Sequence, residues 1–203
     1  MTRVLVTYAT MAGSTADVAA AIAGKLNEQG IEADVRPMSE AGDLARYDGV
    51  VAGGPMIMGW HREARAYLRR HRREWARVPL AVFVTAISLT DTGDLDGAGA
   101  VFVDERLPKP PAQVGRLSFR ERYARLANYL RPIYAAARPA APVSIGVFGG
   151  RLEFGRLKWW AVLFVALVIR APAGDYRNWD AISDWAAALP EAMGLRETAL
   201  AAD

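Results

Sequence analysis

The stretch "RVLVTYATMAGSTADVAAAI", residues 3–22, joins an apolar run to a helical pattern through a short loop rich in hydroxyl groups. Residues 3–8 include β-branched side chains and are predicted to form a strand that is buried on both faces. After the loop, apolar residues recur every four positions, which predicts a helix over about 14–29. A buried strand that leads through a few polar residues into a helix is typical of α/β proteins.

The rest of the chain repeats this alternation of strands and helices. Further strands are predicted at 31–37, 48–55, 79–87 and 143–150. Further helices are predicted within 62–77, over about 119–133 and from Trp179 onward. Pro132 is expected to kink or end the second of these helices. Continuous apolar strands need cover on both faces, so the pattern predicts a doubly wound parallel sheet that binds ligands at the carboxyl ends of its strands.

The composition indicates one α/β domain, 1–203, in which 52% of the residues are hydrophobic. The absence of cysteine excludes disulfides, and the two histidines cannot form a histidine-rich metal site, so no metal is expected. The first predicted strand begins almost at once, so no signal peptide is expected and a cytoplasmic location is predicted. The segment 92–115 is too long for an ordinary connection and is predicted to be a functional excursion or a mobile loop.

The positive charge is clustered, although the net charge is only +3. Residues 62–77, "REARAYLRRHRREWAR", contain seven arginines and two glutamates. Three interpretations remain open at this point: a solvated helix face, attraction to an anionic lipid surface, or attraction to a substrate that carries carboxylates. No nucleic-acid recognition motif accompanies the charge, so nucleic acid is not an expected partner.

The loop after the first strand has the chemistry of an anion site. Thr10, Gly13, Ser14 and Thr15 combine three hydroxyls with the free backbone N–H groups of a helix N-terminus. The chain contains no G-x-x-x-x-G-K-[ST] motif, and "GAGAVF" at 97–102 lacks the third glycine of a dinucleotide-binding loop. The alternative is that the serine and threonine only cap the helix.

The run "TYATMAGSTADVA" resembles the phosphate loop of the flavodoxin family, in which threonine or serine, two variable residues, glycine, a small polar residue and threonine follow one another. This resemblance implies a five-stranded sheet of order 2-1-3-4-5 with FMN bound at the strand ends. It implies a phosphate grip of neutral donors, without a basic residue. By this resemblance, the FMN phosphate is held by Thr10, Met11, Ala12, Gly13, Ser14 and Thr15.

Two further loops match the places where flavodoxins contact the isoalloxazine ring. They are "GGPMIMGWHRE" at 53–63 and "TAISLTDTGD" at 85–94. Trp60 is expected either to stack on the flavin or to be a partly buried loop aromatic. The ring contacts that the resemblance implies are Pro55, Met56, Ile57, Met58, Gly59, Trp60, Thr85, Ala86 and Ser88.

A long insert at about 149–178 resembles that of the bacterial menaquinone-dependent protoporphyrinogen IX dehydrogenases, which share this fold. The matching residues are Gly150, Leu152, Phe154, Arg156, Trp159, Trp160, Gly174 and, just beyond it, Trp179. The chain departs from their pattern at Pro55 and Met56, where serine and isoleucine are usual. It also departs in the longer 92–115 excursion and in a shorter run at 171–178.

The insert contains eleven consecutive apolar residues, "WWAVLFVALVI" at 159–169. As a helix these residues would span about 16 Å, roughly half the hydrocarbon core of a bilayer, so they are not expected to cross it. Three destinations remain open: contact with the membrane or a quinone, an interface between copies of the chain, or the domain's own core.

The resemblance implies an FMN-dependent oxidoreductase of haem biosynthesis on the inner face of the cell membrane, which oxidises protoporphyrinogen IX and passes the electrons to menaquinone. The alternatives are an electron-carrier flavodoxin and a quinone or flavin reductase of the same fold. Carriers are usually acidic and lack the insert. His61 is a candidate for a proton relay or a plain surface histidine. Candidate contacts to substrate propionates or to the membrane are Arg62, Arg65, Arg151, Arg156, Trp159 and Trp160.

Overall fold

The protein is described by a computed structural model, in which residues 1–57, 59–91, 101–113, 115–152 and 172–195 are placed. A parallel sheet of six strands forms its centre, in the order β2-β1-β3-β4-β8-β6. The strands are β1 (Arg3–Tyr8), β2 (Glu32–Pro37), β3 (Gly49–Pro55), β4 (Leu80–Ala86), β6 (Val101–Val103) and β8 (Ser144–Gly149). The predicted order 2-1-3-4-5 is confirmed in the first five strands of this sheet.

The sixth strand corrects the prediction for the 92–115 excursion. Within it, β6 pairs in parallel with β8 at the sheet edge, with Phe102 opposite Gly146. The backbone N–H of Asp104 then donates to the carbonyl of Val147 at 2.9 Å, which continues the ladder. A short β-branched and aromatic run therefore satisfies the open edge of β8 and makes the sheet six-stranded, where the sequence analysis expected five strands and a functional excursion or mobile loop.

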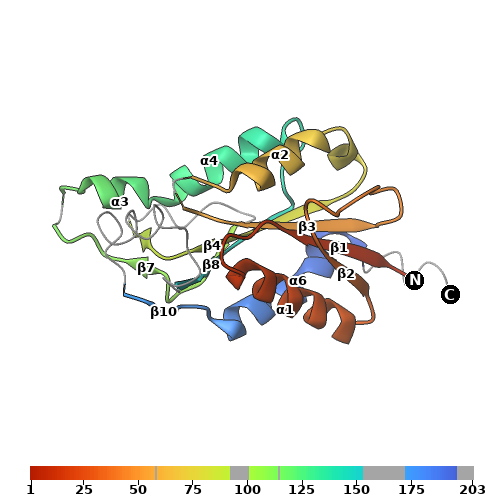
Figure 1. Ribbon diagram of the computed structural model, residues 1–203, viewed down its shortest axis with the longest axis horizontal. Coiled ribbons are helices and arrows are strands. Elements are labelled where there is room, and N and C mark those ends of the chain that lie inside the picture. Colours follow the sequence, from red (N-terminus) through yellow and green to blue (C-terminus); the bar gives the residue numbers. More distant parts are fainter. Residues whose placement is uncertain (58, 92–100, 114, 153–171, 196–203) are drawn as a thin grey trace.

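Helices cover both faces of the sheet (Figure 1). On one face lie α1 (Ser14–Glu28) and α6 (Trp179–Ala192), and on the other lie α2 (Arg62–Arg70) and α4 (Leu126–Ala137). The strands are buried because their side chains alternate between the two cores: Val50 and Val82 face α2 and α4, whereas Val51 faces α1 and α6. A 3₁₀ turn, η1 (Glu74–Ala76), follows α2.

The single helix predicted over about 119–133 is two helices, α3 (Phe119–Tyr123) and α4. They separate because the carbonyl of Ala124 accepts a hydrogen bond from Thr90 N–H at 2.8 Å, and Arg125 is extended. The helical spacing placed Phe119 on a buried face, but its side chain is 70% exposed. Pro132 lies inside α4, which continues to Ala137 instead of ending there.

Two small sheets stand at the carboxyl ends of the main strands. β5 (Leu89–Thr90) pairs in parallel with β7 (Pro108–Lys109), and β9 (Arg151–Leu152) pairs antiparallel with β10 (Gly174–Asp175). These pairs fold the excursion and the two ends of the insert back over the sheet edge. They therefore bring distant parts of the sequence to the edge where a parallel α/β sheet binds ligands.

Gly149, at the end of β8, supplies a prediction about stability. A Cβ atom at Gly149 would lie 1.8 Å from the backbone oxygen of Tyr176, so Gly149→Ala must displace the chain before α6. We expect it to lower the free energy of unfolding by about 1–3 kcal/mol in urea titrations. The control is Gly24→Ala in α1, where a Cβ meets no atom within 4 Å and where a gain of up to about 1 kcal/mol is expected. Equal effects of the two variants would contradict the close approach.

Candidate functional site

The loop between β1 and α1 folds back on itself. The Thr10 hydroxyl accepts a hydrogen bond from Gly13 N–H, with 2.9 Å between oxygen and nitrogen. Gly13 precedes the helix with a φ of 93°, a conformation that costs a glycine little. Among the described side chains, none caps the first turn of α1. The backbone N–H groups of that turn can therefore bind an anion, which the helix dipole also favours.

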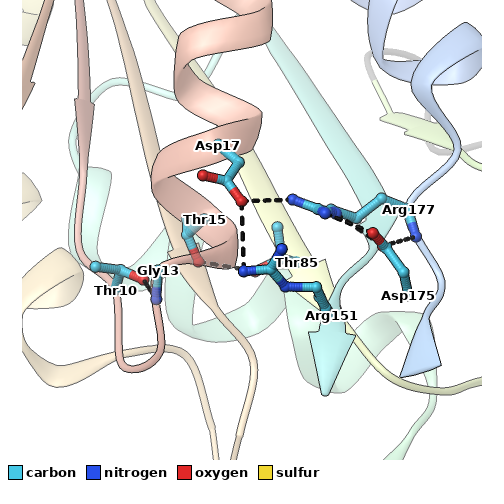
Figure 2. A network of polar contacts seen from close by, with 8 residues as sticks. All are labelled: Thr10, Gly13, Thr15, Asp17, Thr85, Arg151, Asp175 and Arg177. Carbon is cyan, nitrogen blue, oxygen red and sulfur yellow. Dashed lines mark hydrogen bonds and ion pairs between the residues drawn. The ribbon is translucent and has the colours of Figure 1, made fainter. Parts of the chain in front are cut away.

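A contact between two buried hydroxyls ties this loop to the fourth strand. Thr15 Oγ1 lies 3.1 Å from Thr85 Oγ1, and the two residues are 1% and 3% exposed. Figure 2 shows the pair beside the loop that carries Thr10 and Gly13. The start of α1 and the end of β4 are thus held at one place, although 70 residues separate them.

Two arginines converge on the first turns of α1 (Figure 2). Arg177 Nη1 donates to Asp17 Oδ2 at 2.7 Å, and Arg177 Nε donates to Asp175 Oδ1 at 2.7 Å. Arg151 Nη2 lies 3.7 Å from the same Asp17 oxygen. The hydrogen bonds from Arg177 hold the pKa of Asp175 below its usual value. The loop has no charged residue of its own, but the tertiary structure brings two guanidinium groups to the helix that it starts.

An apolar cavity of about 570 Å³ opens at the carboxyl ends of β3 and β4. Its floor consists of residues from the two loops predicted to contact a flavin ring: Met56, Ile57, Ile87, Ser88, Leu89 and Thr90. Its cover comes from β7, the residues after it and α3, with Lys109, Phe119 and Tyr123 among the lining residues. The volume lies within the range typical of small-molecule sites.

A carboxylate joins the two parts of this cover. Glu121 accepts hydrogen bonds from the backbone N–H groups of Ala112 and Ser118, both at 2.6 Å, while the Ser118 hydroxyl caps α3. Hydrogen bonds from Ser118 and Ala112 lower the pKa of Glu121 to about 2. The carboxylate is therefore ionised throughout the ordinary pH range, and it fixes α3 over the cavity.

A buried tyrosine fixes the cavity floor. The Tyr129 hydroxyl, on α4, donates to the carbonyl of Ser88, and Tyr129 is 3% exposed. Burial raises the pKa of this phenol, so it stays protonated and remains a donor. The loop after β4 is thereby held against α4.

A smaller cavity of about 200 Å³ adjoins the first one, because Ile87 and Lys109 line both. Lys109, Arg106 and Arg177 line it, and Asp175 is its acidic residue. Since Asp175 is bound to Arg177, the charges of Arg106 and Lys109 dominate the pocket. Within the described part of the chain, neither of these two forms an ion pair. The pocket suits a carboxylate or another small anion.

Hydrogen bonds to Asp104 fix the turn that carries Arg106. Arg106 N–H donates to Asp104 Oδ1 at 3.1 Å, and Asn178 Nδ2 donates to the same oxygen at 2.9 Å. Asp104 and Asn178 are 1% and 4% exposed. This buried contact joins the excursion to the start of α6, so the smaller cavity is built from segments that are far apart in the sequence.

The loop after β3 brings part of the predicted ring-contact set to the cavity. Pro55 ends β3, and Met56 and Ile57 line the cavity. Gly59 has a φ of 100°, which turns the chain back toward the strand. Met58 lies outside the described residues.

Trp60 and His61 do not line the cavity. Trp60 is 2% exposed, and its Nε1 donates to the carbonyl of Gly54 at 3.3 Å. A backbone bridge between Met56 and Trp60 turns the indole into the core, so the expected stacking of Trp60 on a flavin is not what the structure shows. His61 precedes α2, and burial lowers its pKa, so it is neutral at pH 7.

Of the other residues predicted to lie in the site, some line a cavity and some do not. Ser88 lines the cavity, whereas Ala86 is buried at the end of β4. Arg62 and Arg65, on α2, line neither cavity, and Arg151 lies on Asp17 instead. Three predicted contacts lie outside the described residues: Arg156, Trp159 and Trp160.

The sequence analysis missed the residues that cover the site. One signal was readable: Ser118 and Glu121 have the spacing of a capping box, which marks the start of a helix. Lys109, Tyr129 and Arg177 carried no such signal, because only the folded chain places them at the sheet edge. Within the described residues, no group of histidine and carboxylate side chains could hold a metal ion.

A family model described as "Flavodoxin domain" matches residues 5–178. The match includes most of β1, the loop after it, both loops predicted to contact a flavin ring and the strands that precede those loops. No curated protein has a significantly matching sequence.

Three solved structures are similar to this chain at low identity and with TM-scores below 0.5. Rubredoxin oxygen:oxidoreductase from Desulfovibrio gigas has 11% identity and a TM-score of 0.49, over 95% of this chain and 36% of that one. The flavodoxin of Streptococcus pneumoniae TIGR4 has 12% identity and a TM-score of 0.46, over 96% and 99%. An oxidoreductase from Corynebacterium diphtheriae has 13% identity and a TM-score of 0.43, over 95% and 97%. This chain thus spans about a third of the first protein and nearly all of the other two.

Tyr129 gives a prediction about the cavity floor. Tyr129→Phe removes the donor to Ser88 and leaves a partly buried carbonyl without its hydrogen bond, which costs about 1–3 kcal/mol. We expect FMN to dissociate at least about fivefold more readily, measured by flavin fluorescence during titration of the apoprotein. The control is Tyr134→Phe on the same helix, for which no change is expected. An unchanged affinity in Tyr129→Phe would show that Ser88 does not support the flavin.

Proposed function

Because this chain belongs to the flavodoxin domain family, whose cofactor is FMN, we propose that it is an FMN-dependent oxidoreductase that oxidises protoporphyrinogen IX and passes the electrons to a quinone. The observation that carries the substrate proposal is the pairing of the two cavities. The larger is apolar, and the smaller, which shares Ile87 and Lys109 with it, is basic. A flat hydrophobic molecule with acidic side chains has this distribution of chemistry.

The described residues fit FMN. Thr10, Gly13 and Thr15 lie where neutral donors would hold its phosphate, and Ile57 and Ser88 lie on the cavity floor where its ring would be. When bound, FMN supplies the two-electron redox chemistry of the site. The chain's own residues bind and orient the reactants: Glu121 and α3 cover the cavity and reduce access of water.

In this proposal the smaller cavity orients the substrate. Arg106 and Lys109 line it and would pair with a propionate, while the macrocycle would lie against Phe119 and Tyr123, which line the larger cavity. Phe119 is 70% exposed, so the mouth of the cavity presents an apolar edge. These roles replace those expected of Arg62 and Arg65, which line neither cavity.

An electron carrier of the same fold is the second candidate, and the exposed Phe119 and Tyr123 favour it. Exposed aromatic residues beside a flavin would serve as a docking surface for a redox partner. A carrier requires no substrate cavity, so the two candidates differ in whether a small molecule reduces the flavin directly. A quinone or flavin reductase would accept other reductants in the same cavity.

Anaerobic mixing separates these candidates. We expect protoporphyrinogen IX to bleach the visible absorbance of the FMN-loaded protein within a single turnover, and menadione to restore it. Arg106→Gln should raise KM for protoporphyrinogen about tenfold, since it removes a charge-assisted hydrogen bond. Arg131→Gln, on the exposed face of α4, is the control. A flavin that dithionite bleaches but protoporphyrinogen does not would exclude the proposed reaction.

We propose that the protein works at a membrane surface, because its apolar run 159–169 is flanked by basic residues. Within the described ranges, no helix is both long and apolar enough to cross a bilayer. Phe164→Asp should then reduce sedimentation with anionic lipid vesicles. Val35→Asp, on β2, should not reduce it, because Val35 is exposed outside the insert. Unchanged sedimentation of Phe164→Asp, with FMN content preserved, would contradict this role.

A further inference from the structure

We propose that the exposed arginines of α2 and η1 form a docking surface for the phosphate groups of an anionic lipid bilayer. This arginine face consists of Arg62, Arg69, Arg70, Arg72, Arg73 and Arg77. It is not a substrate contact, because none of its members is among the described residues that line the two cavities. The inference rests on the membrane location proposed above, but not on the proposed substrate or on the apolar run 159–169.

Only arginine and alanine are exposed between residues 62 and 77. The exposed residues of this segment are Arg62, Ala66, Arg69, Arg70, Arg72, Arg73, Ala76 and Arg77. Its two acidic residues, Glu63 and Glu74, are half-buried, and Glu74 Oε1 lies 3.9 Å from His71 Nδ1. The outer side of α2 and η1 therefore presents cations with no exposed carboxylate between them.

The fold itself gives little reason for so many cations here. Among the residues that the structure describes, no carboxylate forms an ion pair with a member of the arginine face. Arg69 and Arg70 lie in the last turn of α2, where the helix dipole favours a cation. Arg62 is the first residue of α2, where the dipole opposes one. Since the mutual repulsion of the six charges also opposes the folded state, an anionic partner outside the chain explains the arginine face better than stability does.

Three aromatic rings on the inner side hold the arginine face in place. The ring centroid of His71 lies 4.7 Å from that of Tyr67 and 5.9 Å from that of Trp75. Trp75 Nε1 donates to the carbonyl of Leu68 at 2.9 Å, which joins η1 to α2. Tyr67 and Trp75 are buried in the core beneath α2 and α4. Because the backbone of the arginine face is fixed in this way, binding has to order only the arginine side chains.

The helices on the other face of the sheet carry the opposite charge (Figure 1). In α1 and α6 the exposed charged residues are all acidic: Asp17, Glu28, Asp180, Asp184 and Glu191. Lys25, the one basic residue of these two helices, donates to Glu28 at 3.0 Å. The charge of the molecule is thus divided across the sheet. An anionic plane would therefore attract the layer of α2 and repel the layer of α1 and α6.

Exposed aromatic residues on the same helix layer favour a bilayer over a nucleic acid or an acidic protein. Figure 1 shows α3 on the side of the sheet that carries α2 and α4. Phe119 and Tyr123 of α3 are 70% and 37% exposed, and both line the larger cavity. A bilayer supplies phosphates for the guanidinium groups and an apolar interior for these rings. A nucleic acid or a uniformly acidic protein surface supplies the charge alone.

Sedimentation with lipid vesicles tests the arginine face. The full chain is mixed with vesicles of phosphatidylcholine and with vesicles of equal parts of phosphatidylcholine and phosphatidylglycerol. We expect stronger binding to the anionic vesicles, with a preference that falls as salt is raised. Arg70→Gln, Arg73→Gln and Arg77→Gln together should weaken binding to the anionic vesicles roughly 100-fold, since each cation at an anionic membrane contributes about fivefold. Binding to the neutral vesicles should not change, and circular dichroism reports whether the variant is folded.

A second variant separates the arginine face from net charge. The three arginine changes lower the net charge by three, and Asp180→Asn, Asp184→Asn and Glu191→Gln raise it by three to the original +3. Binding of this sixfold variant should stay weak, and recovery to the wild-type level would overturn the proposal. Phe119→Ser should weaken binding to the anionic vesicles but not to poly-L-glutamate. If Phe119→Ser changes neither, while the arginine variant loses poly-L-glutamate as well, the partner is an acidic macromolecule and the lipid proposal fails.

The outcomes also separate the arginine face from the proposed function. Wild-type sedimentation of the arginine variant would overturn the arginine face, whereas a loss of sedimentation in Phe164→Asp would still support the membrane location. If the wild-type chain bound neither kind of vesicle, the membrane location and the arginine face would fail together. A flavin that protoporphyrinogen does not bleach would leave the arginine face standing.

Discussion

The parallel direction of the central strands is the constraint on which the rest of this structure depends. Because β1, β3, β4 and β8 run the same way, the loops that follow them all leave from one edge of the sheet. The hydroxyl contact between Thr15 and Thr85 is a direct consequence, since it joins the loop after the first strand to the end of the fourth. The loop after β1 and the apolar cavity therefore lie at the same edge of the sheet.

Charge at this edge is organised in pairs of opposite sign. Arg177 stands between Asp17 and Asp175, and its contacts join α1 to the segment before α6. Charges this close to a helix N-terminus contribute to the potential that an incoming anion meets.

The residues that cover the cavity show where sequence patterns fail to predict the structure. Helical spacing predicted one helix through Phe119 and Ile133, but the hydrogen bond from Thr90 to Ala124 ends the first helix early and leaves Phe119 at the surface. The same kind of competition sends Trp60 into the core, because a backbone bridge with Met56 turns the loop back. Periodicity indicates which residues are apolar. It does not indicate which of several apolar regions each residue will pack against.

The sequence by itself determined the alternation of strands and helices and the loop at 10–15 between the first strand and the first helix, because these follow from local periodicity. The order of the first five strands was implied by the resemblance to the flavodoxin family. Only the tertiary structure decided that β6 extends the sheet, that Arg151 and Arg177 meet Asp17, and that Lys109 stands between two cavities. Those placements depend on contacts between residues tens to more than a hundred positions apart, and such contacts leave no periodic trace in the chain.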